Sequence, residues 1–76
     1  MTLGKRIKKL RRQRGWSVEV LAANAGITRK TLQEIENGVR AGPRLDTLQL
    51  IAKALHIELY KLFKEEEEYE LIGIGD

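Results

Sequence analysis

The chain has 76 residues, contains no cysteine and carries a formal net charge of +3 at neutral pH. This length fits one domain with a modest core, and the absence of cysteine excludes a disulfide framework and any thiolate metal site. No apolar run is long enough to span a bilayer, and the charged start is not followed by a signal-peptide core, so we expect a soluble, cytoplasmic protein without membrane association.

The charge is unevenly distributed along the chain. Residues 1–44 contain 11 Lys and Arg against 3 Asp and Glu, a net charge of +8, whereas residues 45–76 contain 3 against 8, a net charge of −5. A cationic surface supplies the attraction to phosphate that dominates nucleic-acid affinity.

The first predicted helix spans residues 2–14, with Leu3, Ile7 and Leu10 on its inner face. Its many basic residues also have a simpler interpretation as the solvated face of an amphipathic helix. For an isolated charge run we would favour that interpretation. The next two predicted helices favour a nucleic-acid-binding surface instead.

Two short helices are predicted over residues 18–25 and 29–37, joined by a tight turn. Ser17 and Thr28 stand where N-cap residues belong, and Gly26 ends the first helix where a positive φ costs little. This pattern is typical of a helix-turn-helix and points to DNA. Apolar residues recur at the spacing of one buried face: Leu21, Ile27, Leu32 and Ile35. The outer face of the second helix then carries four polar side chains that could reach base edges: Arg29, Lys30, Gln33 and Glu34.

Two more helices are predicted over residues 45–55 and 58–64, after an irregular loop at 39–44. The first has its apolar residues on one stripe: Leu45, Leu48, Ile51, Ala52 and Leu55. We therefore expect an all-α domain of five helices over residues 1–64.

The tail, residues 65–76, combines a run of four glutamates with apolar residues between glycines. Adjacent like charges and glycines favour a frayed helix that becomes disordered. The alternative is a short strand or arm that pairs with a partner chain.

Three blocks in order resemble the lambda-repressor/Cro-type (Xre) family of helix-turn-helix regulators: LGKRIKKLRRQRGWS, LAANAGITRKTLQEIENG and LDTLQLIAKALHIELYKLF. The resemblance implies a compact five-helix fold and sequence-specific transcriptional regulation by a homodimer. It implies base contacts from Arg29, Lys30, Gln33 and Glu34. It implies phosphate contacts from Arg11, Ser17, Val18, Thr31, Asn37, Arg40 and Arg44, together with loop amides between 40 and 44.

The chain departs from the family pattern at three positions. Val18 replaces a glutamine that commonly binds a phosphate, which leaves only backbone amides at this helix start. His56 stands where the family usually has glycine, and Glu58 where it often has a serine or threonine cap, so we expect a loosely capped junction there. In the family Arg11 and Glu36 form an ion pair, and the alternative is an exposed arginine that contributes little.

The interpretation that follows is a DNA-binding transcriptional regulator, of the repressor type, with residues 29–37 in the major groove. Two alternatives remain: an antitoxin or accessory factor that binds a partner protein, and a protein-interaction module that no longer binds DNA. We expect no enzyme, cofactor or metal, since one histidine and carboxylates gathered mainly in a tail provide no catalytic cluster. The expected dimer surface consists of Leu59, Tyr60, Phe63, Leu71, Ile72 and Ile74.

Overall fold

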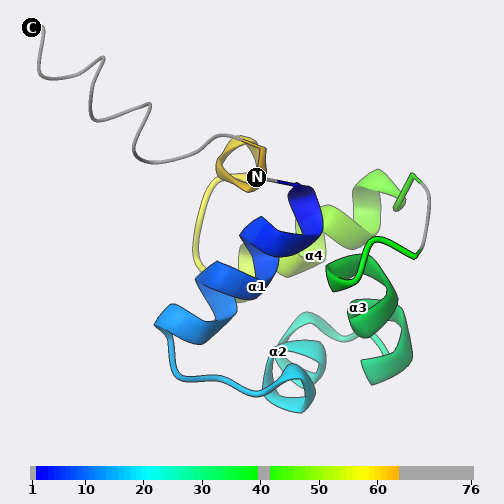
Figure 1. Ribbon diagram of the computed structural model, residues 1–76. Helices are drawn as coiled ribbons and strands as arrows, with labels where there is room; N and C mark the ends of the chain where they lie inside the picture. Colours follow the sequence, from blue (N-terminus) through cyan, green and yellow to red (C-terminus); the bar gives the residue numbers. More distant parts are fainter. Residues whose placement is uncertain (1, 40–41, 64–76) are drawn as a thin grey trace, which may run out of the picture.

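The computed structural model describes residues 2–39 and 42–63. These residues form four α-helices and one short 3-10 helix: α1 (Leu3–Gln13), α2 (Val18–Ala25), α3 (Arg29–Glu36), α4 (Leu45–Ala54) and η1 (Leu59–Leu62) (Figure 1). The predicted all-α class is confirmed, and the four α-helices begin and end within one residue of their predicted limits.

The prediction of a fifth α-helix over residues 58–64 is wrong in the part of that segment that the structure describes. The backbone N–H of Lys61 donates to the Glu58 carbonyl at 3.0 Å, and that of Phe63 donates to the Tyr60 carbonyl at 3.0 Å. These bonds join residues three apart, which is the 3-10 pattern used in short connecting pieces. The segment is held by packing, since Leu62 is only 1% exposed, so it does not need the longer helix that sequence periodicity suggested.

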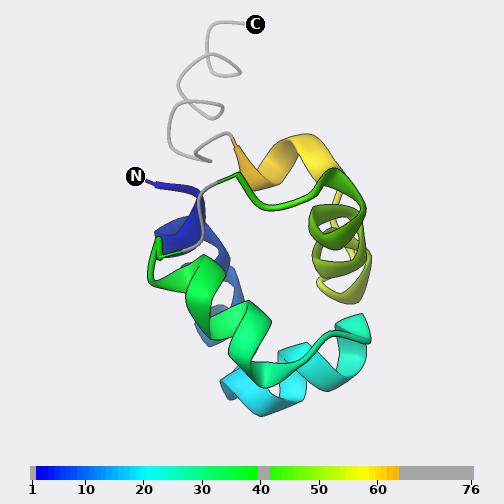
Figure 2. The same cartoon turned by 90° about the vertical axis from the view of Figure 1, so that its right-hand side faces the viewer.

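The core lies between all five elements. Its fully buried side chains come from every one of them: Ile7, Leu21, Leu32, Ile51, Leu55 and Leu62. Helix α1 packs on α3, α2 packs on α3 and α4, and η1 packs on α1 and α4. Figures 1 and 2 both show α2 and the start of α3 at one end of the domain and η1 at the other, beside the chain start. The domain therefore presents two opposite ends with different elements.

One residue expected on the core stripe of α4 lies outside it. Leu45, the first residue of the helix, is 59% exposed, and the buried residues of α4 begin at Leu48. The remaining members of the predicted stripe are buried, as expected.

Helix α1 approaches the end of α3 closely at Gly4. A Cβ atom at this position would lie under 3.0 Å from the carbonyl oxygens of Ile35 and Glu36, so only glycine fits without a backbone shift. This contact fixes α1 against the C-terminal end of α3. The position of α3 therefore depends on α1 as well as on α2.

The junction after α4 is better capped than its sequence suggested. His56 adopts φ 57°, and its N–H donates to the Lys53 carbonyl while the N–H of Ile57 donates to the Ala52 carbonyl, both at 3.0 Å. These two bonds form a Schellman motif, which usually has glycine at this left-handed position. On this side of the junction the expectation of loose capping is wrong, whereas Glu58 makes no side-chain cap at η1, as expected.

Candidate nucleic-acid interface

The turn between α2 and α3 has the capping predicted from its residues. The Ser17 hydroxyl accepts from the Val20 N–H at 3.2 Å, and the Thr28 hydroxyl accepts from the Thr31 N–H at 3.1 Å. Gly26 has φ 72°, in the left-handed region where glycine is favoured. Both helix starts and the turn are thus fixed locally, which orients α3 relative to α2.

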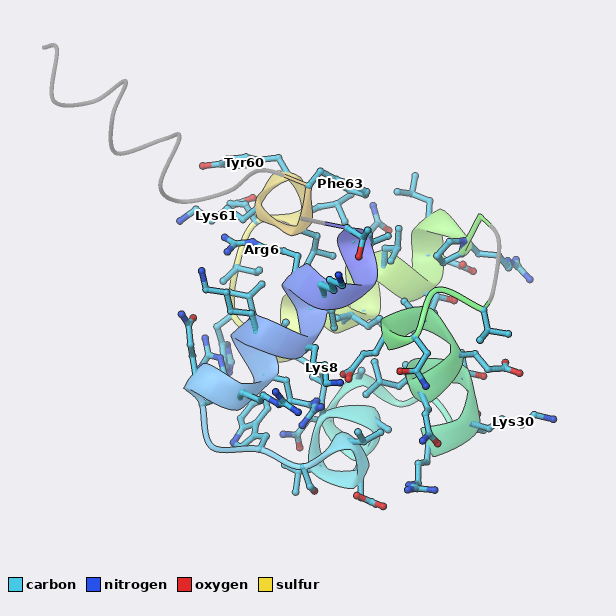
Figure 3. The ribbon with its side chains drawn as sticks, in the orientation of Figure 1. Arg6, Lys8, Lys30, Tyr60, Lys61 and Phe63 are labelled. Carbon is cyan, nitrogen blue, oxygen red and sulfur yellow. The ribbon has the colours of Figure 1, made fainter. Side chains whose placement is uncertain are left out.

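Helix α3 has one buried face and one outer face. Leu32, Ile35 and Glu36 are buried. Opposite them Arg29, Lys30 and Gln33 are exposed and Glu34 is half-buried. At about 100° per residue these four positions span an arc of roughly 140° on one side of the helix. Figure 3 shows Lys30 directed away from the body of the domain, so the predicted recognition face is open to an approaching groove.

Arg29 has a partner that the sequence did not reveal. Its Nε donates to the Glu19 Oε2 at 2.5 Å, and the two side chains are 57% and 60% exposed. Glu19 lies in the first turn of α2, ten positions before Arg29, so helical spacing within either helix gives no sign of the pair. The pair forms because the folded turn brings the starts of α2 and α3 together, which spacing along the sequence does not show.

The pKa of Glu19 is lowered. The largest cause is the hydrogen bond from its own backbone N–H, with further contributions from Arg29 and the Ser17 hydroxyl. The carboxylate is therefore ionised at neutral pH and faces the first residue of the recognition helix.

Arg11 is an internal brace between α1 and α3. Its Nε and Nη2 donate to the two Glu36 carboxylate oxygens at 2.8 and 2.9 Å, and its Nη1 donates to the Trp16 carbonyl at 2.8 Å. The Arg11 and Glu36 side chains are only 9% and 3% exposed. The hydrogen bonds to Glu36 are the main cause that raises the pKa of Arg11. The family-type ion pair is present, and the alternative of an exposed arginine is wrong.

Other basic residues of α1 divide between interior and surface. Arg6 is 2% exposed, and its Nε donates to the Lys61 carbonyl at 3.2 Å, which ties α1 to η1. Lys5 and Arg12 are exposed, and Lys8 is half-buried. The solvated-face interpretation of the basic run therefore fails for Arg6 and Arg11.

The residues predicted to contact phosphate lie in differing surroundings. Ser17, Asn37 and Arg44 are exposed, and Thr31 is half-buried. Val18 is partly buried against the core. The Arg44 Nη2 lies 3.3 Å from the Asp46 Oδ2 in an exposed pair. Arg40 lies outside the described residues.

The predicted dimer surface is partly described. Leu59 is half-buried against the core, whereas Tyr60 and Phe63 are 50% and 61% exposed. Figure 3 places both aromatic side chains at the η1 end of the domain, away from α2 and α3. Leu71, Ile72 and Ile74 lie outside the described residues.

Metal-binding clusters and membrane-spanning helices are both absent from the part of the chain that the structure describes. No group of three or more His, Cys, Asp or Glu side chains there could hold a metal ion. None of the helices there is long and apolar enough to cross a membrane.

Comparison with known proteins identifies the family. A family model described as helix-turn-helix matches residues 7–62, more than half of the chain. The transcriptional regulator SinR of Bacillus licheniformis is 31% identical over 71 residues, which cover 93% of this chain and 64% of SinR. The immunity repressor of Bacillus phage phi105 is 39% identical over 66 residues, which cover 87% of this chain and 45% of the repressor.

A solved structure agrees with these sequence relatives. The biofilm regulator SinR, solved in complex with DNA, matches with a TM-score of 0.79 at 28% identity, covering 83% of this chain and all of that one. The chain spans about two thirds or less of the curated relatives described here. Its fold, its capped turn and the family match agree, and the chain therefore belongs to the helix-turn-helix family of the lambda-repressor/Cro (Xre) type.

Proposed function

We propose that this chain binds double-stranded DNA sequence-selectively as a transcriptional regulator, acting in the cytoplasm as a homodimer. The observation that carries the proposal is the outer face of α3, where Arg29, Lys30 and Gln33 are exposed on a helix fixed by two caps and a left-handed glycine. An α-helix fits the major groove, where arginine and lysine bind guanine and glutamine binds adenine. The relatives named above are regulators and repressors, which supports a binding role over an enzymatic one.

The phosphate contacts are proposed around this face. Ser17 and Val18 lie at the start of α2, whose amides and positive dipole end suit an anion. The other contacts come from both ends of α3: Thr31 lies in its first turn, Asn37 is its C-cap, and Arg44 lies farther along the chain, before α4. Residues at these places could contact phosphates on both sides of the major groove. For Arg11 the structure supports the brace to Glu36, and a phosphate contact remains a prediction.

Arg44→Ala is expected to weaken binding to all duplexes alike and to reduce the slope of log affinity against log salt by about one unit, because one phosphate contact is lost. Lys53→Ala, which removes an exposed charge from α4, is the control and should leave the slope unchanged. Fluorescence anisotropy across a salt series measures the effect. If Arg44→Ala has the same slope as the wild type, Arg44 does not contact the DNA backbone. If the wild-type protein binds no duplex, the result favours the alternative of a protein-interaction module.

The dimer surface is proposed at the η1 end. Tyr60 and Phe63 are large exposed aromatics, which are the side chains that anchor protein interfaces. They lie opposite the α2 and α3 end, so a second copy bound there would leave both recognition helices free. Two such helices can enter successive major grooves about 34 Å apart on one face of DNA.

Tyr60→Asp, or deletion of residues 65–76, is expected to weaken the homodimer while the monomer stays folded, because each removes apolar surface from the proposed interface. Leu50→Asp is the matched control, since Leu50 is another exposed apolar residue but lies on α4. Sedimentation velocity gives the monomer–dimer equilibrium and circular dichroism gives the fold. Unchanged equilibria would remove these residues from the interface, and a wild-type protein that stays monomeric in solution would instead favour a different protein partner.

A further inference from the structure

The ion pair between Glu19 and Arg29 connects the two helices of the helix-turn-helix at the point where α3 would enter DNA. Arg29 is the first residue of α3, and Glu19 lies in the first turn of α2. The Arg29 Nε and the Glu19 Oε2 are 2.5 Å apart although both side chains are more than half exposed.

The Glu19 carboxylate also interacts with its own helix. It lies near the positive end of the α2 dipole and accepts a hydrogen bond from the Glu19 backbone N–H. The Ser17 hydroxyl, which also caps α2, adds to the stabilisation of the charged form. These contacts favour the ionised form of the carboxylate.

The closest contact of the pair is at one particular atom of Arg29. A guanidinium has one Nε–H and two Nη groups, and the Arg29 Nε is the nitrogen nearest to the Glu19 carboxylate. The two Nη groups form the fork that matches guanine O6 and N7 in the major groove. An arginine already held through Nε loses less conformational freedom when that fork binds a base.

We propose that Glu19 is a positioning residue for base recognition, which holds Arg29 through its Nε so that both Nη groups face a guanine in the major groove. This inference rests on the proposed DNA-binding function. It assigns the base pair opposite Arg29 as G·C, and it makes selectivity at that pair depend on a residue of α2 that does not touch the base.

Glu19 has a second effect of opposite sign on affinity. A carboxylate at the start of α2 repels the phosphate that this helix start would bind, so its removal should strengthen binding to all duplexes. Selectivity and general affinity therefore change in opposite directions when Glu19 is neutralised. If the Glu19 carboxylate only competed with DNA for Arg29, its removal would raise both the selectivity and the general affinity.

The test compares Glu19→Gln, Arg29→Ala and the double variant with the wild type. Asp46→Asn is the matched control, because it neutralises the carboxylate of another exposed ion pair, that with Arg44. Each protein selects from a pool of randomised duplexes, and its affinity for the wild-type consensus is compared with that for duplexes changed at single base pairs. Circular dichroism checks the fold of each variant.

We expect Arg29→Ala to lose the preference for one G·C pair by about 5- to 150-fold, the range for a bidentate base contact. Glu19→Gln should lose at least about fivefold at the same pair while its affinity for non-consensus duplexes rises, and the double variant should be no less selective than Arg29→Ala. Asp46→Asn should keep the wild-type consensus.

A measurement without DNA separates this inference from the proposed function. Titration of the Glu19 carboxyl by NMR should show that its pKa rises in Arg29→Ala, because the pair is lost. An unchanged pKa, or a Glu19→Gln protein that keeps full selectivity at the Arg29-dependent pair, overturns the inference and leaves DNA binding intact. A wild-type protein that selects no sequence contradicts the proposed function, and the inference falls with it.

Discussion

Glu36→Ala is expected to destabilise the domain by about 3–5 kcal/mol, because it leaves the Arg11 charge buried without its partner. The Arg11 side chain is 9% exposed, and two of its nitrogens donate to Glu36. A domain of this size has a total stability of roughly 4–11 kcal/mol, so the loss is a large fraction of the whole. Urea unfolding followed by circular dichroism measures it.

Arg12→Ala is the control for this experiment. Arg12 is the neighbouring arginine of α1 and is exposed, so its removal should change stability by no more than about 0.5 kcal/mol. The double variant Arg11→Ala/Glu36→Ala should lose less than the two single losses combined, because no charge is left buried alone. Equal unfolding midpoints for Glu36→Ala and Arg12→Ala would contradict a structural role for the pair.

Arg29→Ala and Lys30→Ala are each expected to reduce discrimination between the preferred sequence and other sequences by about 1–3 kcal/mol, since contacts to base edges carry that much selectivity. Both residues are exposed on the outer face of α3. Binding to random duplexes should fall much less, because phosphate contacts remain. Competition binding with selected and random duplexes measures the two effects separately.

Lys53→Ala serves as the control for charge alone, because Lys53 is exposed on α4, outside the helix-turn-helix. It should leave discrimination unchanged. If Arg29→Ala and Lys30→Ala weakened selected and random duplexes equally, these residues would be phosphate contacts and the face of α3 would not read bases.

Local signals predicted most of this fold. Ser17, Gly26 and Thr28 act within a few residues of themselves, so their roles as caps and turn could be inferred from spacing. The outer face of α3 could be predicted from the helical spacing of its apolar residues, Leu32 and Ile35. The spacing of Leu59 and Leu62 predicts an α-helix in the last segment, but this spacing does not distinguish a docked 3-10 turn from a short α-helix.

Contacts between distant segments were predictable only in part. The Arg11 and Glu36 pair could be anticipated from the family resemblance, but burial of Arg6 against the Lys61 carbonyl could not, because nothing local marks an arginine as internal. The Glu19 and Arg29 pair depends on how the turn places two helix starts side by side. Such contacts are set by tertiary geometry, which periodicity and capping do not encode.

The most direct test of sequence-selective DNA binding is selection of duplexes from a randomised pool by the wild-type protein, followed by footprinting of the selected site. We predict enrichment of an inverted repeat whose half-sites lie about 34 Å apart, with protection on one face of the duplex. A pool that shows no enriched sequence after repeated selection, at a salt concentration where the protein still binds DNA, would contradict the account.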